Sequence, residues 1–175
     1  MIKAGPTWRT KGDEWDHKGR SDIAQIIISR SEHRIKFIHF LYVEDEGNRL
    51  VLSQKIGGGG AKSLDTIKLD YPSEYITRVS GKYNYRWFSK FLRSFTLETN
   101  IRTYGPYQAG TPSCWYKEIE FNYEVQGKFW GFFGTHRSLK FCGLFGAHKR
   151  DGIESIGIYI KPAENLNQNR ISYIT

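Results

Sequence analysis

The chain has 175 residues, of which 39% are hydrophobic and 25% charged, and its formal net charge is +8. This length and composition predict one globular domain with an ordered core and argue against extended disorder. The positive charge permits an anionic partner such as nucleic acid, a membrane surface or an acidic glycan, and it is equally compatible with solubility alone.

The N-terminal residues include no apolar segment of the kind that a secretion signal needs, and no stretch reaches the roughly 18 apolar residues of a membrane span. Cys114 and Cys142 lie far apart and lack the spacing of a metal or redox motif. Free thiols in a reducing compartment are therefore expected. The predicted location is cytoplasmic or nucleocytoplasmic.

Apolar and polar residues alternate with a period of two, which predicts β-strands rather than helices. In residues 118–125, for example, Ile119, Phe121 and Tyr123 alternate with acidic or amide side chains. The three isoleucines of residues 26–28 are β-branched, and we expect them to be buried on both faces of a sheet. In chain order, the predicted strands are residues 26–28, 34–43, 67–71, 118–125 and 156–160.

Turn residues recur at short intervals between the strands. The chain contains 18 glycines, and 15% of its residues are aromatic. Together with the scarcity of helix signals, this pattern is typical of an all-β sandwich, barrel or prism. We expect one all-β domain over residues 1–162 and a polar C-terminal tail over residues 163–175, which is either a linker or a loosely docked extension.

One short sequence occurs twice in similar form, as KFWGFFG at residues 128–134 and as KFCGLFG at residues 140–146. Two such strands, separated by residues 135–139, predict a hairpin whose strands present equivalent faces. The alternative is that glycine- and aromatic-rich strands of one sheet resemble each other without any duplication.

The sequence contains no pattern typical of an enzyme. The five histidines show neither HExxH nor similar spacing, and there is no GxSxG nucleophile motif. We expect His39 to be a hydrogen-bonded core or rim residue. Asp13, Glu14 and Asp16 surround Trp15, and we assign them structural roles rather than a metal site. The sequence therefore predicts a protein without catalytic residues, metal or cofactor.

The most informative segment lies near the C-terminus, where residues 150–154 (RDGIE) lead directly into an apolar strand. The backbone N–H groups of such a turn and the carboxylate at its end can converge on hydroxyl groups. This segment is therefore a candidate site for a small ligand.

Sequence blocks spread over almost the whole chain resemble those of the jacalin-related lectins, in particular the plant mannose-binding type. Each block is weak by itself, but their common order makes a chance match improbable. The blocks are residues 4–6, 12–16, 57–60, 67–76, 79–81, 99–100 with 103–107, and 155–162.

The resemblance implies a β-prism of three Greek-key sheets around a pseudo-threefold axis, with sugar bound by loops at one end. In the family, a glycine-rich N-terminal turn, a Gly-x-x-x-Asp loop and a third glycine-rich loop form the sugar site. The candidate carbohydrate-binding residues in the corresponding loops are Asp151, Gly152 and Glu154, then Gly58, Gly59 and Gly60, and Trp8.

This chain departs from the family pattern in two of the three loops. Trp8 and Arg9 stand where paired glycines are expected, and Arg150 stands where the second loop has its glycine. Glu154 replaces the aspartate, which moves the carboxylate outward by one methylene, or about 1.5 Å. A second sugar site of some relatives would fall at residues 32–36, and we expect it to be absent because Lys36 replaces its acid.

The repeated sequence leaves two alignments open. If residues 140–146 precede the binding loop, then residues 114–138 contain an inserted hairpin. If residues 128–134 precede it, the binding loop itself is enlarged. We prefer the first alignment because it lengthens the loop by a single residue.

Three functions fit these observations. The first is carbohydrate binding with altered or weakened mannose/glucose specificity, in which Glu154 accepts from hydroxyls and Trp8 either supplies an aromatic face or packs against its own loop. The second is binding of an anionic glycan or phosphate through basic loops, whose side chains are alternatively only solvated. The third is a protein-interaction module of defence or stress responses that has lost sugar binding. The candidate anion-binding residues are Arg137, His148, Lys149 and Arg150, with His136 beside them.

We predict a non-enzymatic jacalin-related lectin as the main interpretation. Its expected partner is a carbohydrate, with a protein partner as the alternative. Nucleic acid is not expected, because only the charge and the aromatic content favour it. Exposed edge strands are compatible with a homodimer.

Overall fold

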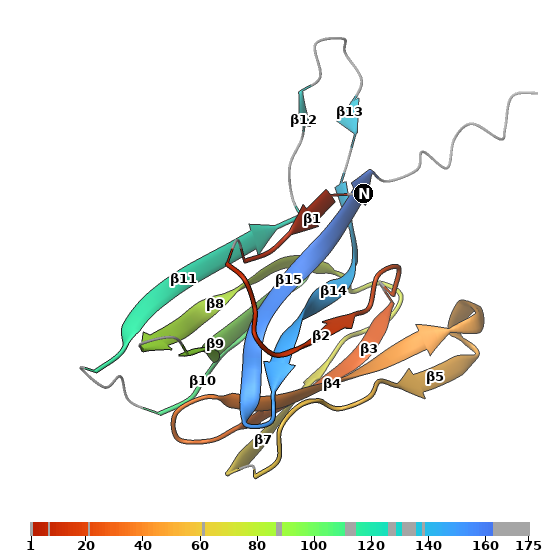
Figure 1. Cartoon of the computed structure of the whole chain (residues 1–175). Helices are drawn as coiled ribbons and strands as arrows, with labels where there is room; N and C mark the ends of the chain where they lie inside the picture. Colours follow the sequence, from red (N-terminus) through yellow and green to blue (C-terminus); the bar gives the residue numbers. More distant parts are fainter. Residues whose placement is uncertain are drawn as a thin grey trace, which may run out of the picture.

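The computed structural model describes residues 2–6, 8–20, 22–60, 62–86, 89–110, 115–125, 129–130, 136–137 and 139–162. These residues form antiparallel strands in three main sheets placed around a common interior, and a separate two-stranded ribbon (Figure 1). Their helical content is the 3-10 turn η1 (Asp45–Gly47), so none of the described residues forms a helix that could cross a membrane.

The first main sheet, which we call the terminal sheet, combines strands from both ends of the chain in the order β1-β15-β14-β2. Its long central strands, β14 and β15, pair over most of their length. The strands are β1 (Ile2–Ala4), β2 (Asp13–Asp16), β14 (Leu139–Lys149) and β15 (Gly152–Pro162).

The second sheet has the order β5-β4-β3-β7, with β6 also paired to β4, and the third has the order β10-β9-β8-β11. We call them the β3–β7 sheet and the β8–β11 sheet. The strands of the former are β3 (Ile23–Arg30), β4 (Ile35–Glu44), β5 (Arg49–Leu52), β6 (Ile56–Gly57) and β7 (Ser63–Lys68). Those of the latter are β8 (Ile76–Arg86), β9 (Ser89–Thr99), β10 (Thr103–Gln108) and β11 (Lys117–Glu124).

All three sheets have Greek-key order. In the β8–β11 sheet three consecutive strands are neighbours, and the fourth returns to lie beside the first. The β3–β7 sheet repeats this order with β3, β4, β5 and β7. The terminal sheet has the same order when its strands are counted as β14, β15, β1 and β2. This third Greek key is therefore assembled from the two ends of the chain. The predicted fold of three Greek-key sheets is confirmed.

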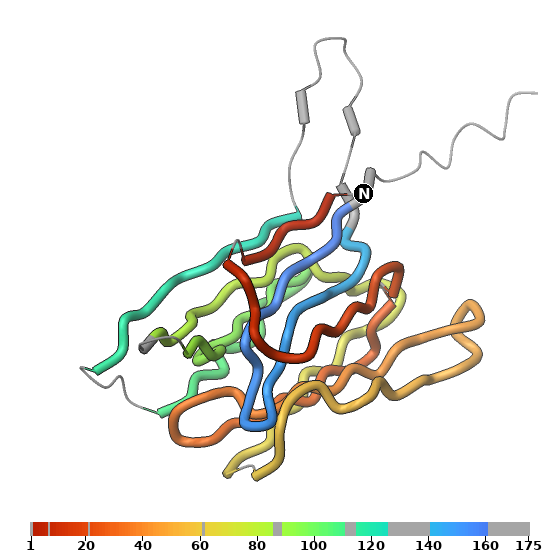
Figure 2. Tube along the Cα trace, in the orientation of Figure 1, coloured from red at the N-terminus to blue at the C-terminus, as the bar shows by residue number. Residues whose placement is uncertain are grey.

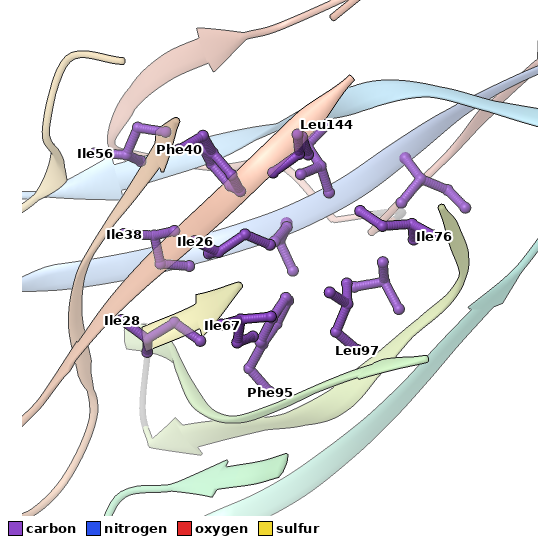
Figure 3. Packing of buried hydrophobic residues seen from close by; sticks show 14 of the residues in the cluster. Ile26, Ile28, Ile38, Phe40, Ile56, Ile67, Ile76, Phe95, Leu97 and Leu144 are labelled. Atoms are coloured by element: carbon purple, nitrogen blue, oxygen red, sulfur yellow. The ribbon is translucent and has the colours of Figure 1, made fainter. Parts of the chain in front are cut away.

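The inner faces of the three sheets meet in one hydrophobic core (Figure 3). Its fully buried members include Ile26, Ile28, Ile38, Phe40, Phe95, Leu97 and Leu144. Ile27 is only half-buried, so the prediction that residues 26–28 are covered on both faces is wrong for this residue. The reason is architectural, because a prism covers each sheet on its inner face and leaves the outer face to solvent.

The repeated sequence does not form the predicted hairpin. Its second copy lies in β14, which pairs with β15 on one side and β2 on the other. From the first copy, Phe129 and Trp130 form β12, which pairs with β13 (His136–Arg137) in a separate ribbon. The two copies therefore belong to different sheets.

Two side-chain predictions can be compared with the structure. Cys142 is a buried free thiol, whereas Cys114 lies outside the described residues, as do residues 163–175 of the predicted tail. The Nδ1 atom of His39 lies 3.2 Å from the carbonyl oxygen of Ser53, which confirms the expected hydrogen-bonded rim position.

Tyr83 on β8 connects the β8–β11 sheet to the terminal sheet. Its buried hydroxyl donates to the carbonyl oxygen of Ile156 over 3.1 Å and accepts from the N–H of the same residue over 3.0 Å. Strand β1 pairs with β15 only at residues 158–160, so it does not reach Ile156. The tyrosine hydroxyl therefore takes the place that a neighbouring strand would occupy.

Replacing Tyr83 by phenylalanine should destabilise the protein by about 1–3 kcal/mol, because the buried N–H and carbonyl groups of Ile156 lose their partner. Urea unfolding followed by tryptophan fluorescence measures this. Tyr123→Phe is the matched control, since among the described residues the half-buried Tyr123 hydroxyl has no hydrogen bond. Equal stability losses for the two variants would refute the role assigned to Tyr83.

Candidate functional site

The candidate ligand turn is the tight connection between β14 and β15. Lys149 pairs with Gly152, which leaves Arg150 and Asp151 as the two turn residues. Because β14 contains residues 140–146, the preferred alignment, in which the second copy precedes the binding loop, is confirmed. In Figure 2 this blue turn lies beside the orange and gold loops that follow β3 and β6.

Glu154 points inward instead of toward solvent. Its side chain is only 4% exposed, and its Oε2 atom accepts from the backbone N–H groups of Lys11 at 3.0 Å and of Gly12 at 2.7 Å. Its Oε1 atom lies 2.8 Å from the Nζ atom of Lys149. A carboxylate can accept about four hydrogen bonds. Three of them are therefore used within the protein.

The N-terminal turn fits closely against this carboxylate. In Figure 2 the red segment between β1 and β2 crosses the blue strands β14 and β15. A Cβ atom added to Gly12 would lie 2.2 Å from the carbonyl oxygen of His148 and 3.0 Å from Oε2 of Glu154. Only glycine permits this approach of the two backbones. Gly12 and Glu154 together therefore fix the end of the crossing segment.

Asp151 has a different environment from Glu154. Its side chain is 59% exposed, and it forms an ion pair with Nη1 of Arg34, from the loop between β3 and β4. The guanidinium of Arg34 lies 4.2 Å from the centre of the Phe91 ring. The Asp151 carboxylate is therefore accessible but is already paired with a cation.

The glycine-rich loop contacts the ligand turn through one of its three predicted residues. Gly58 donates its N–H to the carbonyl oxygen of Lys36 at 2.9 Å, and a Cβ atom here would lie 2.1 Å from the carbonyl oxygen of Arg150. Gly59 and Gly60 are exposed, and a Cβ atom at either would meet nothing within 4 Å. The structure thus places Gly58 against the turn and leaves Gly59 and Gly60 outside it.

Trp8 packs against elements distant in sequence. Its ring lies 5.0 Å from the Tyr83 ring in an edge-to-face arrangement, and the Nζ atom of Lys90 lies 4.3 Å from its centre. Edge-to-face geometry is favourable for aromatic pairs. Of the two predicted roles, packing is therefore realised, but against β8 and β9 rather than against its own loop.

The four candidate anion-binding residues do not form one cluster among the described side chains. Lys149 is neutralised by Glu154. His148 is partly buried, with its Nδ1 atom unpaired. Arg150 is exposed in the turn, and Arg137 lies in β13 with its side chain outside the described part of the structure.

Sequence reasoning missed the partners of Glu154. The backbone N–H groups of Lys11 and Gly12 lie 143 and 142 residues away in the chain, and no local pattern indicates that they would bond to this carboxylate. Within the described ranges, no group of three or more histidine, cysteine, aspartate or glutamate residues could hold a metal ion.

Comparisons with known proteins are consistent with this architecture. Residues 4–140 match the family model of the Jacalin-like lectin domain, so the match ends before the ligand turn. The Arabidopsis thaliana protein RESTRICTED TEV MOVEMENT 1 is 34% identical over 151 residues, which cover 86% of this chain and 76% of the relative. Jacalin-related lectin 24 of the same plant is 32% identical over 170 residues, or 93% of this chain and 68% of that protein.

Among solved structures, the mannose-binding lectin from Champedak superposes with a TM-score of 0.68. The alignment covers 91% of this chain and 96% of that lectin, at 23% identity. This likeness establishes the β-prism fold.

Replacing Glu154 by alanine should destabilise the protein by roughly 3 kcal/mol, because two backbone N–H groups and a lysine ammonium lose their acceptor. Asp151→Ala, which removes an exposed carboxylate of the same turn, should cost less than about 1 kcal/mol. Chemical denaturation of the two variants beside the wild-type chain measures the difference. The same small loss for both would show that the Glu154 contacts contribute little.

Proposed function

This chain belongs to the jacalin-related lectin family, and we propose that it is a non-enzymatic carbohydrate-binding protein with weakened binding of mannose and glucose. The support for weakened binding is the position of the Glu154 carboxylate. It accepts hydrogen bonds from the N–H groups of Lys11 and Gly12. The acid of the second loop is therefore bonded to the N–H donors of the first loop, and neither is free for a sugar.

A sugar at this turn would have to compete with these internal contacts. The Glu154 carboxylate is buried and paired with Lys149, and charge-assisted hydrogen bonds of this kind are the stronger ones. A single sugar hydroxyl replaces only one of them. Family membership supports carbohydrate as the ligand class, and the Champedak lectin of the same fold is named for mannose binding. Mannose or glucose alone is therefore expected to bind this chain weakly.

Protein interaction is the second candidate function, and the outer face of the β3–β7 sheet favours it. Leu50, Leu52 and Leu64 are 60%, 56% and 62% exposed. By strand register, Leu52 lies opposite Leu41, and Leu50 lies opposite Val43. Exposed apolar surface of this kind commonly marks a protein-binding face. The RESTRICTED TEV MOVEMENT 1 relative, whose name refers to no sugar, is compatible with this alternative.

Isothermal titration calorimetry with mannose tests the main proposal. The wild-type chain should give no clear saturation at millimolar mannose. Glu154→Asp should bind mannose more tightly than the wild type, because the shorter side chain withdraws the carboxylate by about 1.5 Å and frees the N–H groups of the N-terminal turn. Glu154→Ala is the control, since it frees the same N–H groups but supplies no acid.

A saturable wild-type titration at millimolar mannose would contradict the weakened site. A glycan array with neutral and acidic ligands then separates the two candidate functions. Binding to any glycan supports the lectin function, and the absence of binding to every glycan on the array favours the protein-interaction module.

A further inference from the structure

A groove of about 640 Å³ lies beside the segment that crosses the terminal sheet. Its volume falls within the range of about 300–1,000 Å³ typical of small-ligand sites. Phe145 and Ser155 of the central strands contribute to its lining. Its chemically distinctive residues are Lys3, Trp8 and Arg9 from the N-terminal segment and Glu14, Trp15 and Asp16 from β2.

Two of the four charged groups in the groove are already engaged. Asp16 accepts from the Tyr159 hydroxyl at 2.6 Å and from the N–H of Lys18 at 2.8 Å. The Nζ atom of Lys3 lies 4.0 Å from the centre of the Phe145 ring. These contacts hold Asp16 and Lys3 in place within the protein.

Arg9 and Glu14 are the remaining charged groups. Both are exposed, and neither has an ion-pair partner in the part of the chain that the structure describes. Arg9 belongs to the crossing segment and Glu14 to β2, so a cation and an anion line the groove from two different elements. A ligand that carries both an anionic group and hydroxyl donors satisfies both of them.

Two buried indoles add a second observation. The Nε1 atoms of Trp8 and Trp15 are buried, and neither has a hydrogen-bond partner. Trp15 is only 9% exposed, and both residues line the groove. Buried donors are normally paired in folded proteins. Because both residues line the groove, a ligand bound there would change the surroundings of the two indoles.

We propose that this groove binds an acidic sugar, either a uronic acid or a sulfated residue, with Arg9 pairing the anionic group and Glu14 accepting from a ring hydroxyl. The inference rests on the proposed carbohydrate-binding function and assigns its ligand to the groove instead of the Glu154 turn. Lys149 of the predicted anion-binding group is neutralised by Glu154, which leaves the turn with less uncommitted positive charge.

Titration of the ¹⁵N-labelled chain with D-glucuronate and with D-glucose tests this proposal, because the two sugars differ only at the oxidised carbon. The tryptophan indole N–H signals are followed by NMR. Glucuronate should shift the Trp8 and Trp15 signals, and glucose should shift them much less. Arg9→Gln should weaken glucuronate binding about tenfold, the effect expected for loss of one charge-assisted contact.

Arg150→Gln is the matched control, because it makes the same change in charge at an exposed arginine in the β14–β15 turn. It should leave glucuronate binding unchanged. Equal weakening by Arg150→Gln and Arg9→Gln, or equal shifts with glucose and glucuronate, would overturn the proposal. Glycan binding on an array without any change in the two indole signals would reject the groove while leaving the proposed function intact. The absence of any carbohydrate binding would reject both.

Discussion

The fold can close only if the N-terminal segment crosses two strands that come from the other end of the chain. β1 and β2 lie on opposite edges of the terminal sheet, with β15 and β14 between them, so the connection from β1 to β2 must pass across these strands. The Glu154 carboxylate fixes the end of this crossing by accepting two backbone N–H groups, and Lys149 balances its charge. The third Greek key depends on this connection.

The same contacts constrain what the protein can bind. The resemblance to the family implies that the first and second loops supply donors and an acid to the sugar. Here the Glu154 carboxylate bonds to the N–H groups of Lys11 and Gly12 and to Lys149, and a buried carboxylate with three partners is costly to displace. Trp8 strengthens the arrangement, because it packs against Tyr83, whose hydroxyl in turn holds Ile156 of β15. The contacts that stabilise the crossing segment are therefore the same contacts on which the proposed weakening of sugar binding rests.

The sequence was sufficient to predict the fold class but not to predict every pairing between strands. Alternation of apolar and polar residues located β4 and β11 closely, because half-buried strands leave this pattern in the chain. It could not show that the two KF-containing copies lie in different sheets, since partner choice depends on the whole topology. It also overestimated the burial of Ile27, because a run of isoleucines does not reveal whether a second layer covers the sheet.

The candidate site was located from the sequence, but its internal contacts were not. The family pattern placed the turn at residues 150–154 and identified the unusual residues Trp8, Arg9, Arg150 and Glu154. Covalent geometry indicated that Glu154 would carry its carboxylate farther, without indicating the direction. That direction is set by the N–H groups of Lys11 and Gly12, which approach only in the folded protein. Similarly, the contacts of Trp8 with Tyr83 and Lys90 join segments too far apart for any local rule.

Amide hydrogen exchange at Gly12, measured by NMR with and without mannose, tests the central claim most directly. An amide bonded to a buried carboxylate should exchange slowly, and the protection should not change when mannose is added. Exchange at the rate of an exposed loop, or protection that appears only with mannose, would show that the N–H group is free for sugar and would contradict the account.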